Sequence, residues 1–275
     1  QRPDSGRDRL GEIANQLLQY ICDALLEREI IQELLPDISR PVITYGFDEG
    51  NDYRAEHISQ NKTHTRFIVK GKLLKDKLDI DELPIALNMP GKHNVLNSVA
   101  AIAVAVDEDV DAIAIQSGLE KFQGVGRRFQ IFGDYPVSDG EANGEAMLVD
   151  DYGHHPREVQ ATIQAVRDGW ADRRLVMIYQ PHRYTRTRDL YEDFVDVLSR
   201  VDVLILLDVY SAGEEPIAGA DSRHLSRSIR TRGQIDPIFV EGIDGVPEII
   251  KDIVKPGDIV ITQGAGNVGS LATIL

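Results

Sequence analysis

The chain has 275 residues, a formal net charge of -15 and a pI near 4.9. This length accommodates two domains with cores of their own, and the acidic balance argues against a nucleic-acid partner, whose phosphates require a basic face. The single cysteine, Cys22, excludes a disulfide framework and a thiolate metal cluster. The longest apolar run, residues 99–106, is far shorter than the roughly 20 residues of a membrane span. Because the first residues also lack the apolar core of a signal peptide, we expect a cytoplasmic protein without membrane insertion.

The first 90 residues predict a helix followed by a small sheet. Within residues 1–35, a polar lead precedes an apolar stripe at helical spacing, made of Leu10, Ile13, Leu17, Ile21 and Leu25. Between residues 41 and 90, turn-forming stretches such as EGND and SQNK separate four apolar runs, which predicts a small antiparallel meander. We expect His57 and His64, on these strands, to be ordinary surface histidines. No metal ligand is predicted in the chain.

Polar side chains cluster at the start of the next predicted helix, in the segment GKHNVLNSVAA. Asn94 stands where the helix should be capped. Asn97 follows about one turn later, so both amides and His93 are expected near the helix N-terminus. Amides in this position could bind the donor and acceptor edge of a purine, and the alternative is capping with solvent exposure. The buried face of the helix is apolar and consists of Val95, Val99, Ile102 and Val106.

A glycine-containing stretch, FQGVGRRFQIFG, follows a second short helix that ends at Phe122. It predicts a domain boundary, with domains at residues 1–127 and 128–275. Arg127 and Arg128 are adjacent within it. The pair is either a solvated surface pair or a clamp for a phosphate.

The second half of the chain alternates short apolar runs with helical patterns. Residues 147–149 predict a buried strand, Asp150 and Asp151 end it, and Pro156 opens a helix. Four further runs, LVMIY, VLILL, PIFV and DIVIT, follow with helices between them. This alternation predicts an α/β fold with a doubly wound, mostly parallel, Rossmann-like sheet and right-handed crossovers. Ligands of such sheets bind outside the carboxyl ends of the strands, where Tyr152, His154 and His155 would lie.

Three loops after these strands carry distinctive residues. QPHRYTRTRDL places His182, Arg183, Arg186 and Arg188 directly after a strand, a density of planar cations that suits a carboxylate or phosphate. DVYSAGEEPIAGADS predicts a mobile cover, in which Asp208 is a cap or a ligand. GAGNVG has the form of a dinucleotide fingerprint, but no further strand and acidic residue follow it. We expect these glycines to allow tight packing of a strand and a helix, with a helix-dipole contact to an anion.

Five motifs together strongly resemble the Mur ligases of peptidoglycan synthesis: GKHNVLNSVAA, GRRF, DDYGHHPREV, YQPHRYTRTRDL and QGAGNVG. The resemblance covers about residues 33–275. The family joins an amino acid to a carboxylate with ATP, through an acyl phosphate and a tetrahedral intermediate, and has three domains. The resemblance implies that residues 1–127 are part of the central ATP-binding α/β domain, with an atypical helical lead at 1–35. It implies that residues 128–275 are the C-terminal domain.

The resemblance also implies ligands and site residues. The cofactors are ATP and Mg, and the substrates of the most similar members are UDP-N-acetylmuramate and L-alanine. His93, Asn94 and Asn97 are implied to hold the adenine, and Arg128 is implied to contact the γ-phosphate. Asp151 is implied to bind the ribose, and Tyr152 to lie beside the nucleotide. The residues implied to face the acyl phosphate, the amino acid and the muramoyl carboxylate are His154, His155, Arg183 and Arg186.

Other functions remain open at this point. The 275 residues contain no G-x-x-x-x-G-K-[ST] phosphate loop and none of the family's Mg ligands, so we expect no complete active site from this chain alone. A nucleotide or UDP-muramoyl binding fragment without turnover is one alternative. A murein-peptide recycling ligase is another, although such ligases typically have phenylalanine and alanine where this chain has Tyr152 and Gly153. The hypothesis of an NAD-dependent oxidoreductase is a third alternative, and it rests on the GAGNVG motif alone. An oligomer is compatible with all of these.

Overall fold

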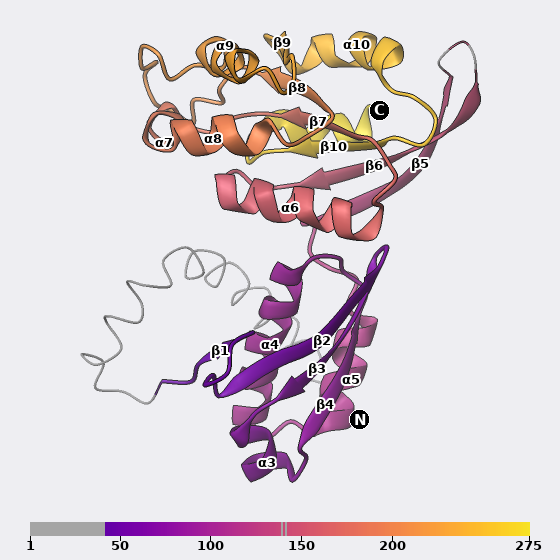
Figure 1. Cartoon of the computed structure of the whole chain (residues 1–275), viewed down its shortest axis with the longest axis vertical. Helices are drawn as coiled ribbons and strands as arrows, with labels where there is room; N and C mark the ends of the chain where they lie inside the picture. The colour runs from indigo at the N-terminus through magenta and orange to yellow at the C-terminus, as the bar shows by residue number, and fades with distance from the viewer. Residues whose placement is uncertain (1–41, 139, 141) are drawn as a thin grey trace, which may run out of the picture. The chain divides into compact units, whose positions relative to one another are not determined.

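A computed structural model describes residues 42–138, 140 and 142–275 (Figure 1). The chain divides into two compact units, with the division between Gln123 and Gly124. The apolar stripe predicted within residues 1–35 lies outside the described residues. The predicted domain boundary at residues 127 and 128 remains a prediction, which limited proteolysis can test.

The sheet of the first unit is mixed. Its strands β1 (Tyr45–Gly46), β2 (Tyr53–Asn61), β3 (His64–Lys70) and β4 (Glu82–Leu87) lie in that order. Strands β2, β3 and β4 form the predicted antiparallel meander. Strand β1 pairs with β2 in parallel, so the prediction of a wholly antiparallel meander was wrong at its first strand. A short helix, α3 (Lys72–Leu78), connects β3 and β4 and was not predicted.

Two helices pack against this sheet and complete the first core. Helix α4 (Lys92–Asp107) contacts β1, β2 and β3, and α5 (Ala112–Lys121) contacts β4. Helix α5 begins where the Asp111 side chain accepts a hydrogen bond from the Ala114 N–H group at 2.9 Å. Each apolar side chain that is fully buried here contributes about 1.5–3 kcal/mol of burial free energy. The core includes Tyr53, Phe67, Val69, Leu83, Val95, Val99, Ile102 and Val106.

The second unit contains the predicted doubly wound sheet, with the strand order β5-β6-β10-β7-β8-β9. Strands β6, β10, β7, β8 and β9 are parallel, and β5 is an antiparallel strand at the edge. The sequence predicted five strands and missed β5, which was interpreted as part of the boundary stretch. Their bounds are β5 (Gln130–Ser138), β6 (Asn143–Asp151), β7 (Leu175–Tyr179), β8 (Val203–Leu207), β9 (Ile238–Val240) and β10 (Ile259–Gln263).

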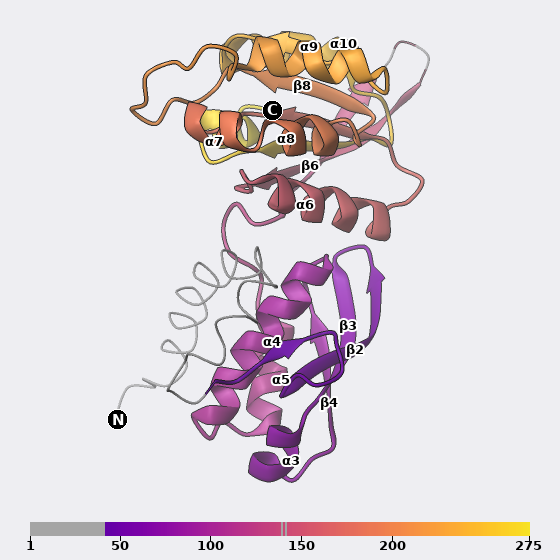
Figure 2. The ribbon, with the colours of Figure 1, turned by 60° about the vertical axis from the view of Figure 1, so that its left-hand side comes forward.

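Helices cover both faces of this sheet (Figure 2). Alternate residues of a strand point to opposite faces. Met147 and Val149 therefore join one core with α6 (Pro156–Gly169), α8 (Tyr191–Leu198) and α9 (Ser222–Arg232). Ala146 and Leu148 join the other core, with α10 (Val246–Ile253) and the 3-10 helix η3 (Asn267–Thr273). Burial on both faces explains the continuous apolar runs of the central strands. Two short helices, α7 (Tyr184–Asp189) and η2 (Ile243–Gly245), complete the unit.

Candidate functional site

The carboxyl ends of the central strands lie side by side in the second unit. Gln263, the last residue of β10, is in register with Asp151 at the end of β6 and with Tyr179 at the end of β7. Each strand leads directly into a loop at this edge. The edge therefore brings together the loop after β6 and the arginine-rich turn after β7, as the sequence predicted.

Glu158 fixes the loop after β6. Its Oε2 atom accepts hydrogen bonds from the backbone N–H groups of His154 and His155, at 2.9 and 3.0 Å. His155 caps helix α6 and Pro156 occupies its first turn, so Glu158 completes a capping box. Arg128 donates to Oε1 at 3.3 Å. Burial raises the pKa of Glu158, but these hydrogen bonds and nearby positive charge outweigh burial and hold the pKa below its usual value.

Asp151, the residue predicted to contact the ribose, lies at the end of β6 and is buried. The residue is 5% exposed. Its Oδ1 atom accepts from the Gly153 N–H group at 2.7 Å and from Gln263 Nε2 at 3.1 Å, and Oδ2 accepts from the Phe129 N–H group at 2.8 Å. Burial raises its pKa, and the two N–H groups oppose that rise. Both oxygens therefore accept hydrogen bonds within the unit and hold the loop in place, and contact of Asp151 with a ribose stays a prediction.

The two adjacent arginines have different environments. Arg127 donates from Nε to Asp150 Oδ2 at 2.8 Å and from Nη2 to the Gly264 carbonyl at 2.7 Å. Asp150 is 1% exposed and also accepts from Thr262 Oγ1 at 2.6 Å. Arg127 therefore belongs to a partly buried ion pair, which corrects the interpretation of both arginines as one solvated pair or one clamp. Arg128 contacts Glu158 at the loop instead.

The turn after β7 holds its arginines in a defined arrangement. Arg186 donates from Nη1 to His182 Nδ1 at 3.2 Å and to the His182 carbonyl at 3.1 Å. Arg183 precedes α7 with a φ of 72°, which is unfavourable for a residue with a side chain. Arg188 forms an exposed ion pair with Asp189 at 2.8 Å. The structure thus places Arg183 and Arg186 beside His182, whereas Arg188 is engaged at the surface.

A row of four aromatic rings crosses this edge. The ring centroids of Tyr152 and His154 are 5.4 Å apart, those of His154 and His182 are 5.7 Å apart, and those of His182 and Tyr210 are 5.5 Å apart. The last pair is stacked, with an interplanar angle of 12°. At the other end, the guanidinium carbon of Arg127 lies 5.1 Å from the centre of the Tyr152 ring. The row joins the loops that follow β6, β7 and β8.

The charges at this edge come from arginine rather than histidine. Burial, followed by the nearby His154 and arginines, lowers the pKa of His182 to about 4. Burial also lowers the pKa values of His154 and His155, although Glu158 opposes this effect. Fixed guanidinium groups bind carboxylate and phosphate oxygens, and a neutral imidazole can accept a proton. The edge is therefore equipped to bind an anion and to remove a proton from a nucleophile.

The first unit contains the predicted asparagines, but in different roles. The N-cap of α4 is Gly91, so the prediction that Asn94 caps this helix was wrong. Asn94 lies in the first turn, where its Nδ2 atom donates to the Pro90 carbonyl at 2.7 Å. Asn97 donates to Asn94 Oδ1 at 3.5 Å, a weak contact. His93 is half-buried beside them.

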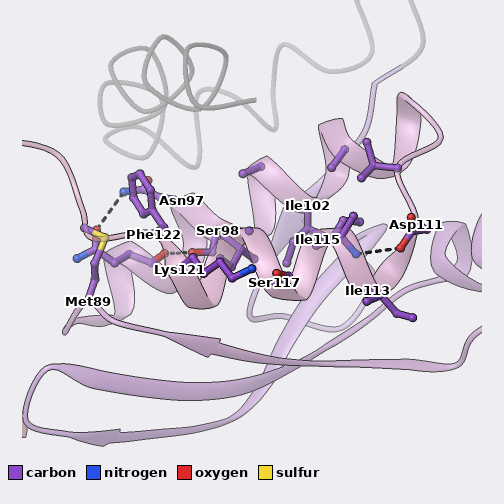
Figure 3. A pocket seen from close by; sticks show the side chains of 17 residues that line it. Met89, Asn97, Ser98, Ile102, Asp111, Ile113, Ile115, Ser117, Lys121 and Phe122 are labelled. Atoms are coloured by element: carbon purple, nitrogen blue, oxygen red, sulfur yellow. Dashed lines mark hydrogen bonds between the residues drawn. The ribbon is translucent and has the colours of Figure 1, made fainter. Parts of the chain in front are cut away.

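Asn94 and Asn97 line a cavity of about 710 Å³ between α4 and α5 (Figure 3). The Oδ1 atom of Asn97 is buried and has no hydrogen-bond partner among the described residues. An unpaired buried acceptor is uncommon and calls for an explanation, such as a ligand that donates to it. His93 does not line the cavity. Apolar side chains dominate the remaining walls, among them Met89, Ile102, Ile115, Leu119 and Phe122.

The glycines of GAGNVG lie where backbone and side chains approach closely. A Cβ atom at Gly264 would stand 2.6 Å from the Gln180 carbonyl oxygen, and one at Gly266 would overlap the Gln180 side chain. One at Gly269 would overlap the Arg127 guanidinium group. These contacts agree with the predicted tight packing. The motif leads into the 3-10 helix η3, not into an α-helix.

Three residues that organise this edge were not predicted as site residues. Glu158 had a local signal, because a glutamate two residues after an opening proline is typical of a capping box. Tyr210 and Glu214 had none, since their partners His182 and Thr185 precede them by 28 and 29 residues. Within the part of the chain that the structure describes, no three His, Cys, Asp or Glu side chains are arranged to hold a metal ion, and no helix is long and apolar enough to cross a membrane.

Two family models match this chain. Residues 127–266 match the model described as Mur ligase, glutamate ligase domain, and residues 13–105 match the Mur ligase middle domain. The chain therefore belongs to the Mur ligase family. The second match begins inside the lead at residues 1–35, so from residue 13 onward this lead corresponds to the family's middle domain.

Solved structures show the same fold. The UDP-N-acetylmuramate-alanine ligase MurC of Thermotoga maritima is 26% identical over 84% of this chain and 46% of its own, with a TM-score of 0.65. A murein peptide ligase of Psychrobacter arcticus is 23% identical over 90% and 48%, with a TM-score of 0.56. MurF of Thermotoga maritima, in complex with ADP, is 16% identical over 90% and 51%, with a TM-score of 0.59. This chain thus spans about half the length of each of these structures.

Proposed function

We propose that this chain contributes to an ATP-dependent ligase of peptidoglycan synthesis, which joins L-alanine to the carboxylate of UDP-N-acetylmuramate. The similarity to MurC of Thermotoga maritima supports these substrates. The observation that carries the proposal is the pairing of Arg186 with a neutral His182 at the sheet edge, with Arg183 adjacent. This arrangement offers fixed positive charge to an anionic substrate beside uncharged imidazoles.

The proposed chemistry assigns roles to the residues of this edge. Arg183 and Arg186 bind the oxygens of the carboxylate and of its acyl phosphate. The amino group of L-alanine attacks the acyl carbon, so the C–N bond forms and phosphate leaves with the electrons of the C–O bond. The amine must lose a proton in this step. His154 and His155, with pKa values lowered by burial, are suited to accept it.

The first unit is proposed to bind the adenine base of ATP. The Oδ1 atom of Asn97, which has no partner in the part of the chain that the structure describes, fits an exocyclic amino group that would donate a hydrogen bond to it. Asn94 makes a weak contact with Asn97 from the preceding turn, and His93 lies beside them. In the second unit, Arg128 is proposed to contact a phosphate, with Tyr152 near the nucleotide. Mg is part of the proposed reaction, and we assign it no ligand among the described residues.

Titration calorimetry tests this proposal directly. The purified 275-residue chain is titrated separately with ATP, UDP-N-acetylmuramate and NAD. Binding of the first two without NAD is expected, whereas NAD binding alone would support an oxidoreductase. Ligation is then measured as phosphate release that depends on L-alanine, after the family's phosphate-loop region has been joined to the chain. Binding without any release in that protein would favour a module that binds nucleotide without turnover.

A murein-peptide recycling ligase is the second candidate, and Gly153 weighs against it. A Cβ atom at this position would stand 2.6 Å from Asp151 Oδ1 and 2.7 Å from Gln263 Nε2. The alanine typical of recycling ligases would therefore displace the buried contacts of this loop. The two candidates are separated by offering L-alanine and a murein peptide in competition. Preference for L-alanine supports the biosynthetic function, and preference for the peptide supports recycling.

A further inference from the structure

Helix α7, which presents Arg186, lacks a cap from its own sequence. The first N–H groups of a helix have no partner within the helix and usually bond to a side chain at the N-cap position. Arg183 occupies that position, and its side chain makes no capping hydrogen bond. A guanidinium group has no acceptor, so arginine cannot cap a helix N-terminus. Another residue must supply the acceptor.

Glu214 supplies it from the loop after β8. Its Oε2 atom accepts from the Thr185 N–H group at 3.0 Å, and Oε1 accepts from Thr185 Oγ1 at 2.7 Å. The same Oε1 atom lies 3.9 Å from Nη1 of Arg183. The side chain is 20% exposed, whereas the neighbouring Glu215 is an exposed residue. One carboxylate therefore satisfies two donors of the arginine-bearing helix and faces the arginine that precedes it.

Further bonds hold the loop of Glu214 against the same turn. The Arg183 N–H group donates to the Tyr210 carbonyl at 2.8 Å, and the Tyr210 N–H group donates to the Pro181 carbonyl at 2.8 Å. The rings of His182 and Tyr210 are stacked, which adds a further contact between the turn and the loop. The Glu214 N–H group donates to the Ser211 carbonyl at 3.0 Å, which closes a turn. The segment expected to be a mobile cover thus begins with a part that is bonded to the arginine turn.

We propose that Glu214 is a positioning residue, which caps helix α7 from the adjacent loop and thereby sets the direction of the Arg183 and Arg186 guanidinium groups. It does not contact substrate. The inference rests on the proposed function, in which these arginines bind substrate anions. The hydrogen bonds from Thr185, foremost that of its hydroxyl, also hold the pKa of Glu214 below its usual value.

The competing explanation is a carboxylate that stabilises the loop without affecting the arginines. Two variants distinguish these explanations. Glu214→Ala removes both acceptors, whereas Glu214→Gln keeps one carbonyl oxygen for one of the two Thr185 donors. A positioning role predicts partial rescue by glutamine of the arginine geometry. Glu215→Ala is the matched control, since it removes an exposed carboxylate from the next position of the same loop.

The experiment uses the 275-residue chain and inorganic phosphate as the probe. Backbone amide exchange at Thr185 reports the cap, and the NMR signals of the arginine Nε–H groups, with their response to phosphate, report Arg183 and Arg186. In Glu214→Ala, we expect exchange at Thr185 to be roughly 2- to 30-fold faster, the range for loss of a helix cap. We also expect shifted arginine signals and weaker phosphate binding. Glu214→Gln should fall between this variant and the unchanged Glu215→Ala control.

Two results would overturn the inference: unchanged exchange at Thr185 in Glu214→Ala, or faster exchange with unchanged arginine signals. If Glu214→Ala does not fold, Thr185→Val provides the second test, because it removes only the hydroxyl donor and should shift the same arginine signals. Failure of the proposed function has a different signature. Equal phosphate affinity in the wild-type protein and in Arg183→Lys would refute the proposal that Arg183 binds substrate anions. Amide exchange at Thr185 and the arginine signals would still decide the role of Glu214.

Discussion

Arg186 donates a hydrogen bond from Nη1 to the Nδ1 atom of His182 at 3.2 Å. A guanidinium group has only donors, so Nδ1 must carry a lone pair. Neutral His182 therefore holds its proton on Nε2. Protonation of Nδ1 would replace this hydrogen bond with a repulsion between two cations, which adds to the larger effect of burial in lowering the pKa of His182 to about 4.

This relationship predicts how stability depends on pH. Between the unperturbed histidine pKa of about 6.5 and the folded value, the unfolded state binds more protons than the folded state, so stability rises with pH in this window. His154 and His155 have pKa values shifted in the same direction and add to the slope. Urea unfolding at several pH values should show a smaller slope for His182→Asn, which retains an acceptor for Arg186. An identical slope in both proteins would contradict a neutral His182.

Arg183 should serve binding rather than stability. Its positive φ is a strained conformation that costs about 1–3 kcal/mol, so Arg183→Gly relieves strain while it removes the guanidinium group. We expect a free energy of unfolding within about 1 kcal/mol of the wild-type value. Phosphate binding should weaken in both Arg183→Gly and Arg183→Lys, since lysine lacks the planar fork. Arg188→Lys is the control, because Arg188 pairs with Asp189 at the surface and should not affect binding.

Asn97 provides a test of the first unit. Its buried Oδ1 atom has no hydrogen-bond partner among the described residues, and an unpaired buried acceptor is costly, so Asn97→Leu should leave stability unchanged or raise it by up to about 1 kcal/mol. ATP binding should nevertheless weaken by roughly tenfold or more, as expected when one hydrogen bond to a base is lost. Ser117→Ala, which alters another wall of the same cavity, should have little effect. Equal ATP affinity in the wild-type protein and in both variants would show that adenine does not bind in this cavity.

Glu158 should control the loop that carries His154 and His155. Glu158→Ala removes the acceptor of both backbone N–H groups, and we expect a loss of roughly 2 kcal/mol in the free energy of unfolding. Its lowered pKa means that this contribution is present above the ordinary glutamate pKa and is lost as the pH falls through the folded value. Chemical denaturation near neutral pH measures the difference. Glu192→Ala, which removes an exposed partner of Arg232, is a suitable control.

The central strands could be predicted from the sequence because burial on both faces demands uninterrupted apolar residues. The runs Leu175–Tyr179 and Val203–Leu207 coincide with β7 and β8. Strand β5 was missed because it lies at the edge and is largely exposed, so no apolar pattern marks it. Asn94 was misassigned as a cap because a side chain that caps a helix and one in its first turn have the same local sequence signal.

The candidate site was predicted only in part, for a related reason. The position of a motif at a strand end follows from the order of the elements, so the sequence could predict which loops meet at this edge, while the roles of their residues stay predictions. The partners of its side chains do not follow from that order. Arg127 and Arg128 are equivalent in sequence, and only the folded unit assigns one to the buried Asp150 and the other to Glu158. Tyr210 and Glu214 act through contacts with a turn nearly 30 residues earlier.

The link between the two units gives the last prediction. Residues 122–125 belong to no helix or strand, and Gly124 has a φ of 86°. The Arg127 side chain donates hydrogen bonds to Asp150 and to the Gly264 carbonyl, and the Arg127 carbonyl accepts one from the Tyr152 N–H group. The mobile part of the glycine-containing boundary stretch should therefore lie before Arg127.

Limited proteolysis can locate this boundary. Chymotrypsin should cut after Phe122, and trypsin should cut after Lys121 sooner than after Arg127, whose backbone is held in place. Asp150→Asn weakens the ion pair of Arg127 and should expose the bond after Arg127 to trypsin. Rapid cutting within residues 146–207, with the link left intact, would refute the boundary. Early cutting after Arg127 in the wild-type protein would instead show that the contacts of Arg127 with Asp150 and Gly264 do not hold the end of the link. A partly buried ion pair protects the backbone only while it persists in solution.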